Sequence, residues 1–175
     1  MNDKKYFIFV DLDGTLIKKD SSFIALKYLF KRRPWLAIKV AFNYFVLGES
    51  WSKFTLGGIS RFLLENSALL SYLGSVKENA HIILATGASF KVARRVVKNY
   101  KVFDSFIAST KTFNCVGQNK LDKIKSLVGG EPFMYIANHW HDWPVWSQAN
   151  KIGVVEPSKV MLNFLNKSGK QVLIF

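Results

Sequence analysis

Short apolar runs, each bounded by polar residues or glycine, recur along the chain and are typical of β-strands. The predicted strands cover residues 6–10, 82–85, 103–108, 133–137, 152–155 and 172–175. Stretches of helical length lie between the later runs, at residues 89–100, 120–128 and 157–166. Because strands and helices alternate, the pattern predicts an α/β fold with a doubly wound, parallel, Rossmann-like sheet.

The alternation is interrupted once, between the first two predicted strands, which more than 60 residues separate. Most of this interval has helical character, and Pro34, Gly48 and Asn66 divide it into segments. The predicted helices cover residues 21–33, 35–47, 51–64 and 67–73. We therefore expect a core domain of residues 1–19 and 75–175, and a small α-helical cap of residues 20–74 inserted after the first strand.

The longest apolar stretch, residues 34–48, lies inside this predicted cap. Lys39 and Asn43 interrupt it, and it is shorter than the ~20 residues that a membrane-spanning helix needs. The stretch predicts a buried helix, with a helix lying on a bilayer surface as the alternative.

The chain is strongly basic, with 25 Lys and Arg residues against 12 Asp and Glu residues. This excess favours polyanions or an anionic membrane surface as partners, above all at the basic segment 27–39. We interpret a second basic segment, residues 91–101, as a solvated helix face. No zinc-finger, homeodomain or RNP-type pattern is present, so we expect no specific nucleic-acid partner.

Composition also bears on location. Hydrophobic residues make up 49% of the chain, which predicts a folded protein. A single cysteine allows no internal disulfide, and the first residues, MNDKKYF, lack the apolar segment of a secretory signal. We expect a cytoplasmic protein, with membrane association as a further option. The apolar last residues, QVLIF, suggest that more sequence follows.

Candidate chemistry begins where the first predicted strand ends, in FVDLDGTL. Asp11 and Asp13 follow this strand, and ligands bind at the carboxyl ends of strands in open α/β sheets. Two carboxylates at one edge can hold a divalent cation while one attacks and the other transfers protons. A strand that ends in an Asp-Gly turn is the competing interpretation.

Two further motifs deliver phosphate-binding groups to the same edge. The second predicted strand continues into IILATGAS, where Thr86 offers a hydroxyl and Gly87 an unhindered backbone N–H. In VGQNKLDKI, Lys120 lies near the start of a helix, where both the cation and the helix N-terminus favour an anion. Lys120 alone would be interpreted as surface charge.

The segment YIANHWHDWPVW, residues 135–146, follows another predicted strand and brings Asn138 and Asp142 to the edge. His139 and His141 would share one face of an extended strand, as zinc ligands can. A structural zinc site needs four ligands, however, and the chain offers three histidines and one cysteine without a second paired motif. We interpret Trp143 and Trp146 as packing residues because of their helical spacing.

These four motifs, in this order and with a helical insertion behind the first, resemble the haloacid dehalogenase-like (HAD) superfamily of aspartate-nucleophile phosphatases. The layout is most similar to the soluble HAD domain associated with UbiA-like prenyltransferases. The resemblance implies Mg²⁺ as cofactor and a two-step transfer through an aspartyl-phosphate, with Asp11 as nucleophile and Asp13 as general acid and base. It also implies two binding sets: Leu12, Thr86, Gly87 and Lys120 for phosphate, and Asp11, Asp13, Asn138 and Asp142 for metal.

The last motif departs from the family's pattern. Where the family commonly has Gly-Asp, this chain has Ala137 and Asn138, so one negative charge is missing from the expected magnesium shell. The main expectation is an Mg²⁺-dependent phosphomonoester hydrolase acting on a small metabolite phosphate, a prenyl phosphate or phosphotyrosine. The alternatives are a catalytically weak pseudo-enzyme that binds phosphorylated ligands or an anionic membrane surface, and a phosphotransferase.

Overall fold

The computed structural model describes residues 6–17, 34–35, 38 and 65–175 of the 175-residue chain. Most of the predicted cap, all but residues 34–35, 38 and 65–74, lies outside the described residues, as does the most basic part of the segment 27–39. The described elements, in chain order, are β1 (Phe7–Val10), α4 (Ser67–Val76), η1 (Lys77–Asn79), β2 (His81–Ser89), α5 (Phe90–Asn99), β3 (Ser105–Ser109), α6 (Gly117–Val128), β4 (Phe133–Ala137), η2 (Trp140–Asp142), α7 (Trp143–Trp146), β5 (Lys151–Val154), α8 (Lys159–Asn166) and β6 (Gln171–Ile174).

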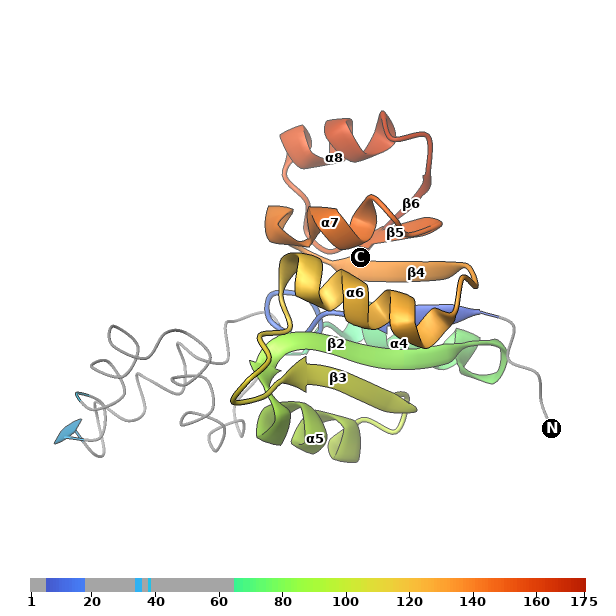
Figure 1. Cartoon of the computed structure of the whole chain (residues 1–175). Helices are drawn as coiled ribbons and strands as arrows, with labels where there is room; N and C mark the ends of the chain where they lie inside the picture. Colours follow the sequence, from blue (N-terminus) through green and yellow to red (C-terminus); the bar gives the residue numbers. More distant parts are fainter. Residues whose placement is uncertain (1–5, 18–33, 36–37, 39–64) are drawn as a thin grey trace.

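The strands form one six-stranded sheet in the order β3-β2-β1-β4-β5-β6 (Figure 1). Every neighbouring pair is parallel. This is the doubly wound order of the Rossmann type, so the predicted α/β fold is confirmed. The chain changes direction across the sheet between β1 and β4, and the crevice at such a switch point is where ligands bind in open α/β sheets.

Side-chain alternation along the strands gives the sheet two apolar faces, because successive residues of a strand point to opposite sides. On β1, Ile8 and Val10 belong to the core cluster with α4 and α5, whereas Phe9 belongs to the cluster with α6, α7 and α8. In Figure 1, α6 lies in front of the sheet and α4 behind it. Both faces are covered, as an all-parallel sheet requires.

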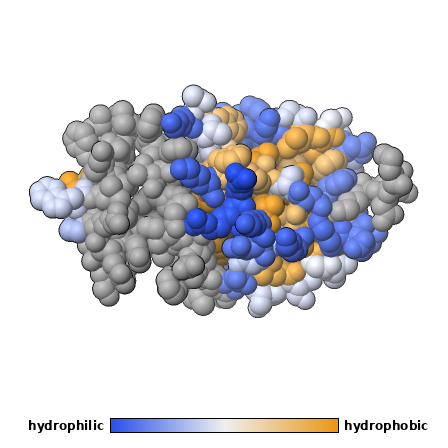
Figure 2. All heavy atoms as spheres, turned by 90° about the horizontal axis from the view of Figure 1, so that it is seen from below, coloured by the Kyte–Doolittle hydropathy of each residue, from blue (hydrophilic) through white to orange (hydrophobic). Residues whose placement is uncertain are grey.

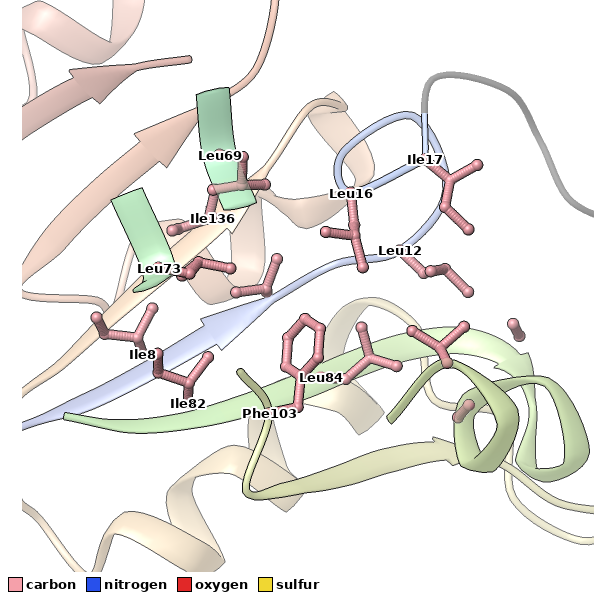
Figure 3. Close-up of a cluster of buried hydrophobic side chains, with 14 of the residues drawn as sticks. Ile8, Leu12, Leu16, Ile17, Leu69, Leu73, Ile82, Leu84, Phe103 and Ile136 are labelled. Carbon is pink, nitrogen blue, oxygen red and sulfur yellow. The ribbon is translucent and has the colours of Figure 1, made fainter. Parts of the chain in front are cut away.

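Helix α4 covers the face of the sheet that carries Ile8 and Val10, which we call the first face, with its first core cluster. Residues 67–73 of this helix were predicted to belong to the cap. Its Leu69 and Leu73, one turn apart, are fully buried. They pack with Leu12, Leu16 and other residues of the first cluster (Figure 3). Burial of each leucine stabilises the fold by roughly 2 kcal/mol. The helix therefore packs as part of the core layer, while the domain boundary itself stays a prediction.

Helix α5 exposes the basic side chains that the sequence analysis interpreted as a solvated face. Lys91, Arg94, Arg95 and Lys98 are exposed, whereas Val96 on the opposite side is buried. Seen from below, hydrophilic side chains gather in the middle of the face that α5 covers (Figure 2). The interpretation of these residues as an exposed face is confirmed.

Among the described helices, none is long and apolar enough to cross a bilayer.

Candidate active site

The candidate site lies at the carboxyl ends of β1 and β4, the two strands at the switch point of the sheet. Asp11 directly follows β1, and its backbone N–H donates to the carbonyl oxygen of Ile136 in β4 at 2.9 Å. In the register of β1 and β2, Val10 pairs with Leu84, so Thr86 follows on the same edge. The fold thus brings the predicted motifs to one place.

The loop after β1 is fixed by its own backbone. The carbonyl oxygen of Leu12 accepts hydrogen bonds from the N–H groups of Thr15 at 3.3 Å and Ile17 at 3.0 Å. Gly14 has a φ of 73°, a left-handed conformation that favours glycine. The Leu12 side chain is buried in the first core cluster, so only its backbone is left for the predicted phosphate contact.

Lys120 is the centre of the site. Lys120 lies on α6 and is only 3% exposed. Its ammonium Nζ donates to Asp11 Oδ1 and to Asp142 Oδ1, both at 3.0 Å. Asp142 lies at the end of η2 and is also buried. The predicted phosphate-binding lysine and two of the predicted metal-binding carboxylates are therefore in direct contact, in a buried ion triad.

Tyr135 completes the cluster, and the sequence analysis missed it. Its hydroxyl oxygen accepts a hydrogen bond from Lys120 Nζ at 2.7 Å, and its O–H donates to Asp142 Oδ1 at 2.5 Å. In the sequence it stands in an apolar strand, FMYIA, where a tyrosine is readily interpreted as packing. The available signal was strand alternation, which places its side chain on the face that α6 covers.

The cluster carries more negative than positive charge. Burial, with the nearby carboxylates of Asp142 and Asp13, raises the pKa of Asp11 to about 7, although Lys120 opposes the rise. Burial works against the charge of Lys120, but Asp11 and Asp142 outweigh it and hold the lysine pKa above its ordinary value. Burial and the same two carboxylates raise the pKa of Tyr135 well above its usual range. Lys120 is therefore charged and Tyr135 neutral near pH 7.

Helix α7, which follows Asp142, is held at its far end by Lys170. The ammonium of Lys170 donates to three backbone carbonyl oxygens, those of Trp146 at 3.1 Å, Ser147 at 2.6 Å and Ala149 at 2.7 Å. Trp146 is fully buried, and the ring of Trp143 packs against Phe164 at 4.8 Å. The prediction that these two tryptophans are packing residues is confirmed, and together the contacts fix the segment that carries Asp142.

Ser109, which no sequence motif predicted, anchors the segment IILATGAS that carries Thr86 and Gly87. Thr86 Oγ1 accepts a hydrogen bond from the Ala88 N–H at 2.9 Å, and no described residue accepts the hydroxyl's own proton. Gly87 is held through its carbonyl oxygen, which accepts from Ser109 Oγ at 2.8 Å. The predicted strand 103–108 stopped one residue before Ser109, at the edge where its hydroxyl acts. The Thr86 hydroxyl is available to donate to a ligand oxygen.

Asn138 lies against the loop after β1. A Cβ at Gly14 would come within 2.1 Å of Asn138 Nδ2, so glycine is required for this close approach. Thr15 Oγ1 donates to Asn138 Oδ1 in a long contact of 3.4 Å. The amide oxygen therefore lies beside the loop that carries Asp11 and Asp13.

The oxygen donors of the site suit a hard divalent cation, bound with modest affinity. Two buried carboxylates, Asp11 and Asp142, share the single positive charge of Lys120. Burial is the main cause of the raised pKa of Asp11, and the nearby Asp142 adds to it. The oxygen donors around them are those that Mg²⁺ prefers. Among the described residues, however, no three His, Cys, Asp or Glu side chains converge on one point. Asn138, backbone oxygen and water would have to complete a magnesium shell.

The two histidines of the last motif lie on the surface. The His139 and His141 rings are 4.5 Å apart, and His139 Nδ1 accepts from the His141 N–H at 3.3 Å. Both side chains are exposed, and neither has a recorded contact with Asp11 or Lys120 within the described part of the chain.

No protein-family model matches this sequence, and no curated protein matches it. Solved structures do. A protein of unknown function from Bordetella pertussis Tohama I aligns with a TM-score of 0.74 at 14% identity, over 97% of this chain and 98% of that one. A substrate-bound phosphoserine phosphatase aligns with a TM-score of 0.67 at 10% identity, over 98% and 93%. A HAD family hydrolase from Salmonella enterica serovar Typhi aligns with a TM-score of 0.68 at 14% identity, over 91% of this chain and 65% of that one. The chain thus has the fold of HAD-family hydrolases.

Proposed function

We propose that this protein is an Mg²⁺-dependent phosphomonoester hydrolase in which Asp11 is the nucleophile and Asp13 the general acid and base. The observation that carries the proposal is the buried contact of Asp11 Oδ1 with Lys120 Nζ at 3.0 Å, at the switch point of the sheet. Asp11 is a buried carboxylate with a raised pKa, it contacts a lysine, and the Thr86 hydroxyl at the same edge of the sheet is available to donate to a ligand oxygen. Such a combination is typical of an active site.

In the first step a carboxylate oxygen of Asp11 attacks phosphorus, and the bond from phosphorus to the ester oxygen breaks. The Asp13 carboxylic acid gives its proton to the departing oxygen, so an alcohol leaves and an aspartyl-phosphate forms on Asp11. Lys120, the Thr86 hydroxyl and the Gly87 N–H donate to the phosphoryl oxygens as charge develops on them.

In the second step the Asp13 carboxylate takes a proton from water, and the resulting hydroxide attacks phosphorus. The acyl–phosphate bond breaks, which returns Asp11 as a carboxylate and releases inorganic phosphate. Asp13 is protonated again and ready for the next ester.

Magnesium would be held by Asp11, the Asp13 backbone carbonyl, Asn138 and Asp142, and when bound it neutralises charge on the transferring phosphoryl group. Asn138 in place of a carboxylate weakens this binding, because hard cations gain affinity from ligand charge.

The proposed substrate class is a phosphate monoester of a small molecule or of a phosphotyrosine side chain. One similar structure is a substrate-bound phosphoserine phosphatase, which supports a small phosphomonoester. Three points stay predictions. They are the likeness to domains associated with UbiA-like prenyltransferases, the cytoplasmic location, and the contact of the basic cap with an anionic membrane.

A second candidate function is phosphate-ligand binding with little turnover. Asn138 favours it, because this amide stands where the HAD pattern commonly has a charged metal ligand, while the Lys120 cluster that would hold a phosphoryl group is intact. Such a protein would bind inorganic phosphate but would not release it from an ester.

The test is hydrolysis of p-nitrophenyl phosphate with and without Mg²⁺ by the wild type, Asp11→Asn and Asp122→Asn. Asp122→Asn is a matched carboxylate-to-amide control, because Asp122 is exposed on α6 and bonds only Gln118 among the described residues. We expect Mg²⁺-dependent release of inorganic phosphate by the wild type and the control, and loss of at least ~100-fold in Asp11→Asn. Phosphate binding without release would favour the second candidate, and transfer of phosphate to an added alcohol would identify a phosphotransferase.

A further inference from the structure

We propose that Tyr135 is a positioning residue whose hydroxyl holds Asp142 when Lys120 turns from that carboxylate to a phosphoryl oxygen. This inference rests on the proposed function, which assigns the phosphoryl contact to Lys120. No motif of the sequence points to Tyr135; its hydrogen bonds to Lys120 and Asp142 do.

Lys120 has no spare hydrogen-bond donor in the structure. A lysine ammonium has three N–H groups. Lys120 Nζ has three acceptors in the structure: Asp11 Oδ1 at 3.0 Å, the Tyr135 hydroxyl at 2.7 Å and Asp142 Oδ1 at 3.0 Å. Every donor is in use, so Lys120 can bind a phosphoryl oxygen only after it releases one of these acceptors.

The acceptors of Lys120 differ in the hydrogen bonds that they keep when the lysine turns away. Asp11 Oδ1 has Lys120 as its donor, and no other described residue donates to that carboxylate. Asp142 Oδ1 has two donors, Lys120 and the O–H of Tyr135 at 2.5 Å. A buried carboxylate without a donor is costly, whereas one that keeps a short hydrogen bond is not. Of the two carboxylates, Asp142 is therefore the one that Lys120 releases at lower cost. The third acceptor, the Tyr135 hydroxyl, is neutral, and its O–H keeps its hydrogen bond to Asp142 when Lys120 turns away.

Packing alone does not explain a tyrosine at residue 135. Tyr135 is fully buried, and its neighbours on the same face of the sheet include Phe9 and Phe133. A phenylalanine ring would satisfy the packing there. The hydroxyl is the part that needs an explanation, because burying it is unfavourable unless it is paired. Its two partners, Lys120 and Asp142, are members of the triad.

The proposal predicts a specific effect of Tyr135→Phe on phosphate binding in metal-free buffer, where Mg²⁺ cannot replace a hydrogen-bond donor at Asp142. Without the hydroxyl, Asp142 then depends on Lys120 alone among the described residues, so Lys120 is held back from phosphate. We expect the dissociation constant of inorganic phosphate to rise about tenfold, as the loss of one hydrogen bond to a charged group implies. A fall in this constant would overturn the proposal, because it would show that the hydroxyl only occupies a Lys120 donor. With Mg²⁺ present, the KM for p-nitrophenyl phosphate should also rise, while kcat changes less because Asp11 and Asp13 are untouched. Tyr72→Phe is the matched control, because its hydroxyl makes a 3.7 Å contact with Met134 Sδ outside the site.

A double-mutant cycle with Asp142→Asn tests whether Tyr135 acts through Asp142, with phosphate binding measured by calorimetry. With a neutral amide at residue 142, Lys120 is already free to turn, so adding Tyr135→Phe should leave the phosphate affinity unchanged. If Tyr135→Phe alone fails to fold, the comparison of Asp142→Asn with the double variant still tests the proposal, and a loss of phosphate affinity between those two would overturn it. An equal loss of affinity in both backgrounds would overturn the proposal.

The outcomes separate this inference from the proposed function. A wild type that binds phosphate normally, with Tyr135→Phe indistinguishable from Tyr72→Phe, would overturn the role of Tyr135 alone. A loss confined to thermal stability, with phosphate affinity unchanged, would also overturn it, because it would show a purely structural hydroxyl. A wild type that neither binds phosphate nor hydrolyses its esters would overturn both.

Discussion

Replacement of Lys120 by methionine should destabilise the protein more than any exchange at the surface of α6. Methionine keeps most of the volume of the lysine chain but removes the charge and all three hydrogen bonds. Asp142 keeps the O–H of Tyr135, whereas Asp11 loses the donor it has among the described residues. Removal of one partner from a buried ion pair costs about 3–5 kcal/mol, and we expect a loss in this range.

The loss should depend on pH. Without Lys120 the folded-state pKa of Asp11 rises above its present value of about 7, because the cation that opposes the rise is gone. A carboxyl whose folded pKa exceeds its unfolded value stabilises the fold below the unfolded pKa, and that stability is lost as pH rises through the folded pKa. The deficit of Lys120→Met relative to wild type should therefore be larger at about pH 8 than at about pH 5, by ~1 kcal/mol or more.

Urea unfolding in metal-free buffer at the two pH values measures both effects. Lys123→Met is the matched control, because Lys123 is exposed one turn along the same helix. A deficit for Lys120→Met no larger than that of the control, or equal at both pH values, would refute the argument that Lys120 neutralises buried carboxylates.

Three further predictions follow from single contacts. Tyr6→Phe should leave the free energy of unfolding unchanged or raise it by up to ~1 kcal/mol, because the buried Tyr6 hydroxyl has no hydrogen-bond partner among the described residues. A loss above ~1 kcal/mol in urea unfolding would contradict this, because it would show that the hydroxyl has a partner. Gly14→Ala should lower the free energy of unfolding by ~2 kcal/mol or more, since a Cβ would lie 2.1 Å from Asn138 Nδ2 and the residue has a φ of 73°. Adding Asn138→Ala should recover part of this loss, and no recovery would contradict the predicted clash. Asn138→Asp should lower the half-saturating Mg²⁺ concentration of phosphatase activity by roughly tenfold or more, because a charged oxygen replaces an amide; a value that stays constant or rises would remove Asn138 from the metal shell.

Sequence patterning predicted the sheet well because each strand is an apolar run with clear boundaries. The strand predicted at residues 133–137 is observed as β4, Phe133–Ala137, and all five of its residues are buried. The strand predicted at residues 82–85 is longer, because β2 runs from His81 to Ser89 through the polar end that carries Thr86. Hydrophobicity alone could not extend the strand into residues that serve the site.

The cap boundary was harder to predict, because a helix that packs on a sheet and one that packs in a bundle have the same periodicity. Leu69 and Leu73 would be buried in either setting, and the structure places them against the sheet. Asn66, interpreted as a break between cap helices, is the N-cap of α4 and accepts from the Leu69 N–H at 3.1 Å.

The candidate site was predictable where polar residues follow apolar strands. Asp11 and Asp142 stand out in the sequence for this reason, and the structure joins them through Lys120. Tyr135 could not be found in this way, because its ring fits an apolar strand and its partners become neighbours only when α6 packs over β4. Ser109 was missed because its role is to hold the backbone of another motif.

The central claim, that Asp11 is a phosphoryl-accepting nucleophile, is tested most directly by trapping the intermediate. The wild type would be mixed with p-nitrophenyl phosphate and Mg²⁺, quenched in acid within the first turnovers, and digested for fragmentation mass spectrometry. We predict one added phosphoryl group on the Asp11 carboxylate, absent from Asp11→Asn and from wild type without substrate, and still formed in the control Asp122→Asn. Phosphate release by the wild type with no phosphoryl group on Asp11, or with turnover retained in Asp11→Asn, would contradict the claim.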